Sequence, residues 1–382
     1  MMLISTKVSI LLISYNCSKL IGKVIDSVLD QTFKDFELLI LDNGSSDNSV
    51  DFIKKFNDPR IKLFEEKKNL GPEGSWNYVF NQSQGEYIRI FCSDDIMEKD
   101  CLQKQVSILE KKEDVDFVFT DIQVMNSDFE IIPDHQQLIN IRKDRFEYLR
   151  YAFYEGNPFL TPTFMVRREA LKWGYIMEER RSYFGDYTTW IKLMINGSEP
   201  HVIKECLVYS IKGEHNITSF DNKQKVNNFS FALSHYLEVF CNIQSLEELK
   251  KIFPESDKYT SKMNEKDVDL IPFVIAKLAC DTVLVKQFDR FLSNSHVIFS
   301  LNKIHEILGD RVLAKKIDTL FDFNYFDFVK MTGEFDLKNS QKEESLELLN
   351  DIVASKSLKL FSRFLFRRLY HKVLKIHKIL SY

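Results

Sequence analysis

Two adjacent carboxylates, Asp94 and Asp95, follow the apolar run 87–91 and are the residues of this chain best suited to chemistry. Carboxylates that lie side by side repel each other, and a hard divalent cation relieves that repulsion. Mg²⁺ is typically bound by one or two protein carboxylates together with phosphate oxygens of a substrate. The pair therefore predicts a Mg²⁺ or Mn²⁺ site that acts on a nucleotide diphosphate.

Two further polar clusters follow apolar runs in the same way. Each cluster taken alone is equally well explained by the preference of turns for Asp, Asn, Gly and Ser. Three such clusters favour one ligand site, because ligands of open α/β sheets bind at the carboxyl ends of the strands. Asp42 and Asn43 are then expected to hydrogen-bond a base or a ribose. The clusters are Ser14, Tyr15 and Asn16, which end the run 8–14, and residues 42–47, which follow the run 36–41.

The elements that must position these clusters alternate along the first part of the chain. Continuous apolar runs rich in β-branched residues predict buried parallel strands, and apolar residues at steps of three and four predict helices. Strand, helix, strand, helix in succession predicts a mainly parallel sheet that is covered on both faces. The expected strands are 8–14, 36–41, 61–64, 87–91 and 115–120, and the expected helices are 20–29, 75–82 and 102–111.

Composition and missing motifs exclude several other classes. No lysine-bearing phosphate loop and no G-x-G-x-x-G follows the first strand, which disfavours P-loop and dinucleotide enzymes. The net charge of −4 gives no general attraction to nucleic acid. No signal peptide and no apolar stretch of about 18 residues is found, so we expect a cytoplasmic protein, or one attached to the membrane from its cytoplasmic face.

The distribution of Gly and Pro divides the 382 residues. Ten of the 12 Gly and six of the 8 Pro precede residue 214, and helical patterns dominate afterwards. We expect a first domain at residues 1–220, a helical domain at 221–350 and a separate C-terminal helix at 351–382.

The C-terminal helix is expected to be basic and amphipathic. Residues 356–382 hold eight Lys or Arg and no acidic residue, so residues 1–355 carry −12. Apolar residues recur there at steps of three or four. This pattern is typical of a helix that lies on an anionic membrane surface. The alternative is a helix that docks on the acidic body of the same protein.

Five blocks of the chain, in this order, resemble those of family-2 glycosyltransferases. The resemblance implies a GT-A fold, an α/β domain with a Rossmann-like, mainly parallel sheet, here followed by an all-helical domain. It also implies inverting, metal-assisted transfer of a sugar from a nucleotide diphosphate to an acceptor hydroxyl, in the synthesis of cell-surface polysaccharide or glycoconjugate. The blocks are residues 8–16, residues 27–47, Asn69-Leu70-Gly71 with Asn77, residues 85–95, and Phe184-Gly185-Asp186-Tyr187 with Trp190 and Leu193.

The resemblance also implies a role for each matching residue. Asp94 would bind the metal, with His215 as a further ligand or phosphate contact, and Asp186 would be the general base. The donor would be a UDP-sugar, and the acceptor a saccharide or a lipid-linked glycan. Residues expected at the nucleotide sugar are Ser14, Tyr15, Asn16, Asp42, Asn43, Asn77, Ser93 and Asp95. Alternatively, Asp186 caps a helix that begins near Tyr187, and His215 is a solvated loop residue.

Three residues depart from the family pattern. Cys92 replaces the first Asp of the D-x-D motif, Asn43 replaces the second Asp of the nucleotide loop, and Trp76 stands where an Arg often precedes Asn77. Cys92 and Trp76 are the best support for an alternative, a non-catalytic GT-A-like binding or scaffold subunit. The presence of Asp94, Asp95 and Asp186 argues against it. A nucleotidyltransferase is a second alternative, but it does not explain Asp186 and would need a basic triphosphate loop.

Overall fold

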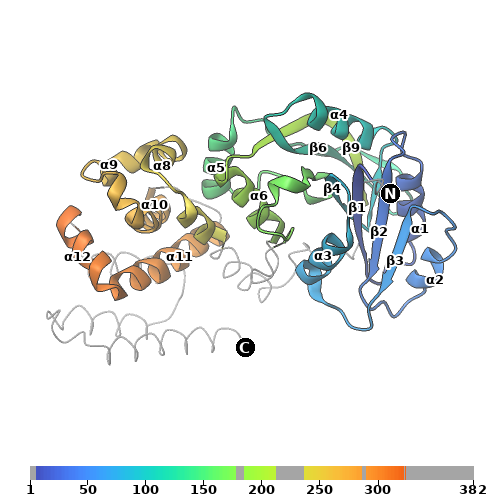
Figure 1. The fold of residues 1–382 in the computed structure, drawn as a ribbon, viewed down its shortest axis with the longest axis horizontal. Coiled ribbons are helices and arrows are strands. Elements are labelled where there is room, and N and C mark those ends of the chain that lie inside the picture. The colour runs from blue at the N-terminus through green and yellow to red at the C-terminus, as the bar shows by residue number, and fades with distance from the viewer. Residues whose placement is uncertain (1–5, 178–184, 212–235, 286–289, 322, 324–382) are drawn as a thin grey trace, which may run out of the picture. The chain divides into compact units, whose positions relative to one another are not determined.

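A computed structural model describes residues 6–177, 185–211, 236–285, 290–321 and 323 (Figure 1). The chain forms two compact units, Met1–Ser219 and Phe220–Tyr382. Among the described residues, no helix is both long and apolar enough to cross a membrane.

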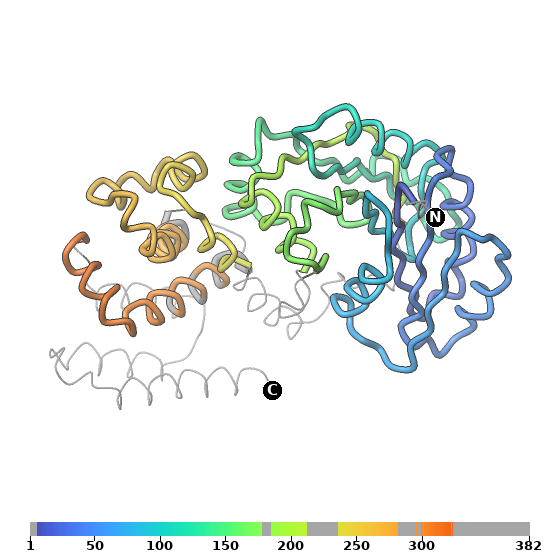
Figure 2. The backbone as a smooth tube through the Cα atoms, viewed as in Figure 1, coloured from blue at the N-terminus to red at the C-terminus, as the bar shows by residue number. Residues whose placement is uncertain are grey.

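The first unit is built on one nine-stranded sheet, which Figure 2 traces as a backbone tube. The strand order is β3-β2-β1-β4-β8-β6-β9-β5, and β7 pairs with β6 outside this path. The strands are β1 (Val8–Ser14), β2 (Phe36–Asp42), β3 (Ile61–Glu65), β4 (Tyr87–Cys92), β5 (Asp95–Met97), β6 (Val115–Met125), β7 (Ile131–Gln137), β8 (Met165–Arg167) and β9 (Glu199–Ile211).

The half of the sheet formed by β3, β2, β1 and β4 is parallel throughout. Strands β1 and β2 are almost completely buried, as their continuous apolar runs predict. Their register places Ser14 opposite Asp42, and Ile13 opposite Cys92 of β4. The carboxyl ends of three strands therefore meet at one edge.

The other half of the sheet is mixed, which differs from the mainly parallel sheet expected. Strand β8 runs antiparallel to both β4 and β6, and β5 runs antiparallel to β9. Parallel pairing there is confined to β6 and β9. Parallel neighbours need crossover connections of a dozen or more residues. Only two residues separate β4 from β5, which is too few for a parallel crossover, and β5 pairs antiparallel with the distant β9.

Helices of the first unit cover both faces of the sheet (Figure 1). Buried residues of α1, α2 and α4 form one core with inward residues of β1, β2 and β4. On the opposite face α3 packs on β1 and β2, and α6 contacts α5 and β9. The helices are α1 (Ile21–Leu29), α2 (Ser49–Ile53), α3 (Gly71–Gln82), α4 (Cys101–Lys111), α5 (Arg145–Tyr154) and α6 (Gly185–Ile195), with short 3-10 turns at Thr161–Thr163 and Arg168–Ala170.

An aromatic core centred on Phe119 of β6 fixes the position of α6. The Phe119 ring stacks on Phe159 with centroids 4.2 Å apart. It also meets Trp190 of α6 edge-on at 5.2 Å. Such pairs add about 0.5–1.5 kcal/mol each to the free energy gained by burying the rings. The first turn of α6, which carries Asp186, is therefore held against the sheet.

The regular elements described in the second unit are all helical. Helices α10 and α11 pack against each other, and the Ser300 hydroxyl of α11 donates to the Ala276 carbonyl of α10 at 2.8 Å. The elements are η3 (Leu237–Asn242), α8 (Leu246–Ile252), η4 (Pro254–Ser256), α9 (Asp257–Thr260), η5 (Glu265–Leu270), α10 (Ile271–Val285), α11 (Arg290–Gly309) and α12 (Arg311–Leu320). The basic segment 356–382 lies outside the described residues.

Candidate active site

The loop after β2 is fixed to the end of β1 by hydrogen bonds. The Ser14 hydroxyl donates to Asp42 Oδ1 at 3.2 Å, and the Asn43 amide N–H donates to the Ser14 carbonyl at 2.8 Å. The Ser45 N–H donates to Asp42 Oδ2 at 2.9 Å, and its hydroxyl donates to Oδ1 at 2.6 Å. Asp42 is 2% exposed, so its carboxylate organises this loop from within.

Asn43 links the same loop to the third predicted block. Its Nδ2 donates to Asn69 Oδ1 at 3.0 Å, and its Oδ1 accepts the Leu70 N–H at 2.8 Å. If Asp42 and Asn43 contact the nucleotide sugar as expected, those contacts compete with the hydrogen bonds that both side chains make within the protein. Tyr15 is different, because 49% of its surface is exposed at the end of β1.

Asn16 bridges the loops that follow β1 and β2. It has φ of 48°, in the left-handed region that Asn tolerates better than most residues. Its Oδ1 accepts the Ser46 N–H at 2.8 Å, and its own N–H donates to Ser45 Oγ at 3.0 Å. The first two polar clusters of the sequence thus form one hydrogen-bonded rim.

An acidic cluster lies at the end of β4. One ligand atom from each of Cys92, Asp94 and Asp95 lies within 4.8 Å of the others. Asp95 is 2% exposed, and its Oδ1 has no hydrogen-bond partner among the described residues. Burial, followed by the Asp94 charge, raises the pKa of Asp95 well above its usual range, and burial also raises the pKa of Asp94. The like charges of the two ionised carboxylates repel each other at this short distance.

A divalent cation suits this donor set. It would neutralise the paired carboxylates and give the unpartnered Asp95 Oδ1 a ligand. The Cys92 thiol is the unusual member, since burial and the neighbouring Asp95 and Asp94 charges raise its pKa well above normal. Asp94 and Asp95 are the oxygen ligands that the site offers.

Asp186 lies in the first turn of α6, near this cluster. Its Oδ1 accepts the Tyr187 N–H at 2.6 Å, and its Oδ2 accepts the Thr161 hydroxyl. Burial raises the pKa of Asp186. The Asp186 charge contributes to the raised pKa of the Cys92 thiol, so the two side chains are close enough to interact electrostatically. The described part of α6 starts at Gly185, and Asp186 lies within it.

Known proteins that are similar to this chain are glycosyltransferases. The family described as Glycosyl transferase family 2 matches residues 9–174. Residues 9–174 are therefore a glycosyltransferase family 2 domain. It is 28% identical to an uncharacterized glycosyltransferase of Methanocaldococcus jannaschii, over 62% of this chain and 82% of that one. It is 35% identical to the Escherichia coli UDP-Glc:alpha-D-GlcNAc-diphosphoundecaprenol beta-1,3-glucosyltransferase WfgD, over 31% of this chain and 47% of that one.

Other relatives of this glycosyltransferase are longer, or share the fold alone. The Pasteurella multocida chondroitin synthase is 25% identical, over 78% of this chain but only 31% of its own length. A solved structure of S. aureus TarS residues 1–349 in complex with UDP has a TM-score of 0.50 and 15% identity, over 78% of this chain and 92% of that chain. The predicted GT-A fold is confirmed for the first unit.

Asn77 of the glycosyltransferase has an internal role that the sequence did not indicate. We expected it at the nucleotide sugar. Its Oδ1 accepts the N–H groups of Ile176 and Met177 at 3.0 and 2.9 Å, and its Nδ2 donates to the Met177 carbonyl at 2.8 Å. The side chain is 6% exposed and ties α3 to the segment that precedes α6. His215 lies outside the described residues.

Two contributors to the site were missed from the sequence. Thr161, which bonds Asp186, carries no local signal because 25 residues separate the two. Arg89 is a charge within an apolar run, a signal that was available. It is fully buried in β4, where its Nη1 donates to the Phe164 carbonyl at 3.3 Å, and its charge lowers the pKa of Asp95.

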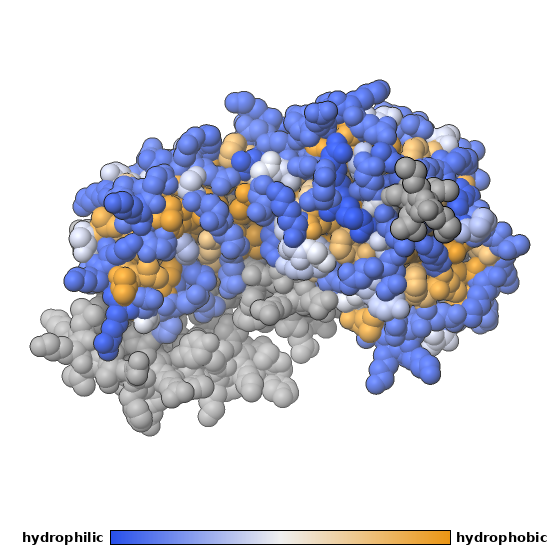
Figure 3. Space-filling view, viewed as in Figure 1, coloured by the Kyte–Doolittle hydropathy of each residue, from blue (hydrophilic) through white to orange (hydrophobic). Residues whose placement is uncertain are grey.

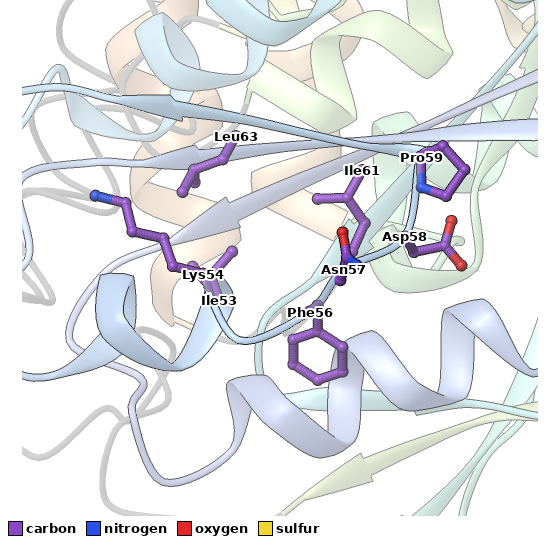
Figure 4. Close-up of a pocket in the computed structure, with 8 residues that line it drawn as sticks. All are labelled: Ile53, Lys54, Phe56, Asn57, Asp58, Pro59, Ile61 and Leu63. Atoms are coloured by element: carbon purple, nitrogen blue, oxygen red, sulfur yellow. The ribbon is translucent and has the colours of Figure 1, made fainter.

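A separate hollow of about 280 Å³ lies beside α2 and β3, and Figure 4 shows its lining. Apolar side chains such as Phe56, Ile61 and Leu63 form much of the wall. None of the predicted site residues contributes to it. Its lining holds one carboxylate, Asp58, and none of the paired carboxylates at the end of β4, so we do not assign it to the donor.

Proposed function

We propose that this glycosyltransferase moves a sugar from a UDP-sugar to an acceptor hydroxyl with inversion, assisted by Mg²⁺ or Mn²⁺. The observation that carries the proposal is the acidic cluster of Cys92, Asp94 and Asp95 at the end of β4, close to Asp186. A metal-holding pair beside a potential base suits a single-displacement transfer, in which a base takes the acceptor proton and a metal stabilises the leaving group.

Asp94 and Asp95 would hold the divalent ion. When bound, such an ion stabilises the negative charge that develops on a departing diphosphate. The rim formed by Asn16, Asp42 and Ser45 presents a rigid polar edge for the nucleoside. The exposed ring of Tyr15 offers a face on which a base can stack.

Asp186 would act as the general base. The acceptor oxygen attacks the anomeric carbon, the bond from that carbon to the diphosphate oxygen breaks, and its electron pair leaves with the diphosphate. The acceptor proton passes to a carboxylate oxygen of Asp186. The bonds from Thr161 and from the Tyr187 N–H fix the orientation of that carboxylate. The burial that raises its pKa makes it a stronger base than a solvated Asp.

Relatives support the choice of donor and acceptor. WfgD is named for UDP-Glc as donor and a diphosphoundecaprenol-linked sugar as acceptor. TarS was solved with UDP. A UDP-sugar and a lipid-linked saccharide are therefore the first pair to test, in the setting of cell-surface polysaccharide or glycoconjugate synthesis.

The deciding experiment uses the full-length protein, a panel of nucleotide sugars, and Mg²⁺ or Mn²⁺. Wild type should bind and slowly hydrolyse one UDP-sugar in a metal-dependent way. Asp94→Ala should lose both properties, because its carboxylate is one of two oxygen ligands. The matched control Asp51→Ala removes an exposed carboxylate of α2 and should behave as wild type. Undiminished UDP-sugar affinity of Asp94→Ala in Mn²⁺ would contradict the proposal.

A further inference from the structure

Cys92 places a sulfur atom where the metal-holding pair needs a third donor. It is the last residue of β4, and it is partly exposed. Its Sγ lies within 4.8 Å of a carboxylate oxygen of both Asp94 and Asp95. The other described cysteines do not belong to this cluster.

We propose that Cys92 is a direct ligand of the divalent ion, and that its sulfur makes this site prefer Zn²⁺ or Co²⁺ to Mg²⁺. This inference rests on the proposed function, because it concerns the ion that assists transfer. It changes the class of metal, because the carboxylates alone favour Mg²⁺ or Mn²⁺, whereas the added sulfur favours a softer ion.

The spacing of the donors fits one shared ion. Zn²⁺ lies about 2.3 Å from sulfur and about 2.0–2.2 Å from carboxylate oxygen, so a sulfur and an oxygen on one tetrahedral ion are about 3.6 Å apart. The three donor atoms lie within 4.8 Å of one another, so side-chain shifts of at most about 1 Å bring them onto one ion. Cys92 is anchored by its pairing with Ile13, whereas Asp95 has an unpartnered oxygen that can turn toward an ion.

The chemistry of the donors sets the preference. Mg²⁺ binds oxygen ligands and gains little from sulfur, whereas thiolates select softer ions such as Zn²⁺. A coordinating thiol loses its proton to the ion's charge, so the mixed set becomes one thiolate and two carboxylates. Serine at this position would offer only a neutral oxygen, and aspartate would make an all-carboxylate site.

Spectroscopy on Co²⁺-loaded full-length protein tests the proposal without reference to activity. Co²⁺ bound by a thiolate shows a near-ultraviolet charge-transfer band that all-oxygen sites lack. Wild type should develop this band on titration with Co²⁺, and Cys92→Ser should not. Since even outer-shell partners are worth about 10–100-fold in metal affinity, loss of the sulfur should weaken Co²⁺ binding by about 10-fold or more. The control Cys206→Ser removes a cysteine of β9 outside the cluster and should keep the band.

Cys92→Asp provides the converse test. It should lose the charge-transfer band and bind Mg²⁺ more tightly than wild type, as measured by calorimetry. A band that persists in Cys92→Ser, or an unchanged ratio of Zn²⁺ to Mg²⁺ affinity in both variants, would overturn the inference. The proposed function is judged separately: turnover of a UDP-sugar with no thiolate band sinks this inference alone, whereas a band without turnover of any donor sinks only the function.

Discussion

At the scale of single residues, the site keeps its acids where water cannot easily solvate their charges. Burial raises the pKa of Asp94, Asp95 and Asp186. A carboxylate in that state is a stronger base and a stronger metal ligand than one in solvent, and it costs folding stability when it ionises. Function and stability therefore oppose each other at these positions.

Replacement of Asp186 by Asn should separate binding from chemistry. Asn keeps the shape and an acceptor for the Tyr187 N–H but cannot take a proton. Donor affinity should stay near wild type, while transfer falls about 10²-fold or more, the usual worth of a general base. Single-turnover transfer and calorimetric UDP binding measure the two effects.

The pH profile of wild type provides a second check on Asp186. Because its pKa is raised, kcat/KM should fall on the acid side at a pH above the ordinary Asp value of about 3.9. Thr161→Val, which keeps the base but removes its hydroxyl partner, should show a smaller loss of transfer. Transfer by Asp186→Asn within a few-fold of wild type would place the base elsewhere.

Asp95→Asn should make the metal-free protein more stable at neutral pH. The raised pKa of Asp95 means that the folded chain binds more protons than the unfolded chain. This contribution favours folding below about pH 3.9 and is lost as the pH rises through the folded-state pKa. In EDTA at pH 7.5 the variant should therefore melt higher, by about 2–4 °C for each kcal/mol regained.

The stability advantage of Asp95→Asn over wild type should shrink toward acid pH, where Asp95 of the wild type is protonated and therefore uncharged. Mn²⁺ should stabilise wild type and leave Asp95→Asn almost unchanged, because the variant lacks a ligand. Calorimetric melting at several pH values distinguishes these cases. A variant that is less stable than wild type at pH 7.5 in EDTA would show that Asp95 is needed to balance the buried Arg89 charge.

At the scale of elements, the positions of helices decide which side chains reach the site. Helix α6 is held by the edge-on contact of its Trp190 with Phe119 in the aromatic core, and α3 holds the segment before α6 through Asn77. The cluster at the end of β4 is completed by β5, whose Asp95 pairs with Ser210 of β9. Each element thus fixes one part of the site.

Asn77→Ala should act through stability and the placement of α6. Its loss leaves the Ile176 and Met177 backbone groups without buried partners, at a cost of about 1–3 kcal/mol. Transfer should fall, while UDP affinity changes little. Asn81→Ala, at an exposed position of the same helix, is the matched control and should match wild type in urea unfolding. A large loss of UDP affinity with unchanged stability would show that Asn77 acts by contacting the donor, as the sequence predicts.

At the scale of the whole molecule, the distribution of charge predicts where the enzyme works. The segment 356–382 holds eight basic residues, whereas residues 1–355 carry a net charge of −12. Deleting it should release the protein from anionic liposomes and slow transfer to a lipid-linked acceptor, while donor hydrolysis is spared. Each basic residue near an anionic surface contributes about 1 kcal/mol, so high salt should weaken the binding of the full chain. Sedimentation with phosphatidylserine vesicles at low and high salt measures this membrane binding.

The alternative is that segment 356–382 docks on the protein itself. If the full-length protein fails to sediment with anionic vesicles even at low salt, the segment is a docking helix. Deletion should then lower the melting temperature, because an apolar stripe would lose its place on the protein.

Local pattern determined the first half of the sheet and the location of its polar clusters. Buried parallel strands such as β1 and β2 need continuous apolar runs, and these runs can be recognised in the sequence without knowing the partner strand. The acids at the ends of β2 and β4 follow such runs directly, so Asp42, Asp94 and Asp95 could be placed at one edge from the chain alone.

Only the tertiary structure decided the rest. Strands β5 and β8 have three residues each, and β7 is polar and exposed, so none has a pattern of its own. Their pairing partners lie far along the chain, as Asp95 and Ser210 do. The roles of Asn77, Arg89 and Thr161 depend on contacts of the same kind. A local pattern records whether a side chain will be buried, but the three-dimensional packing of distant segments selects the group that it meets there.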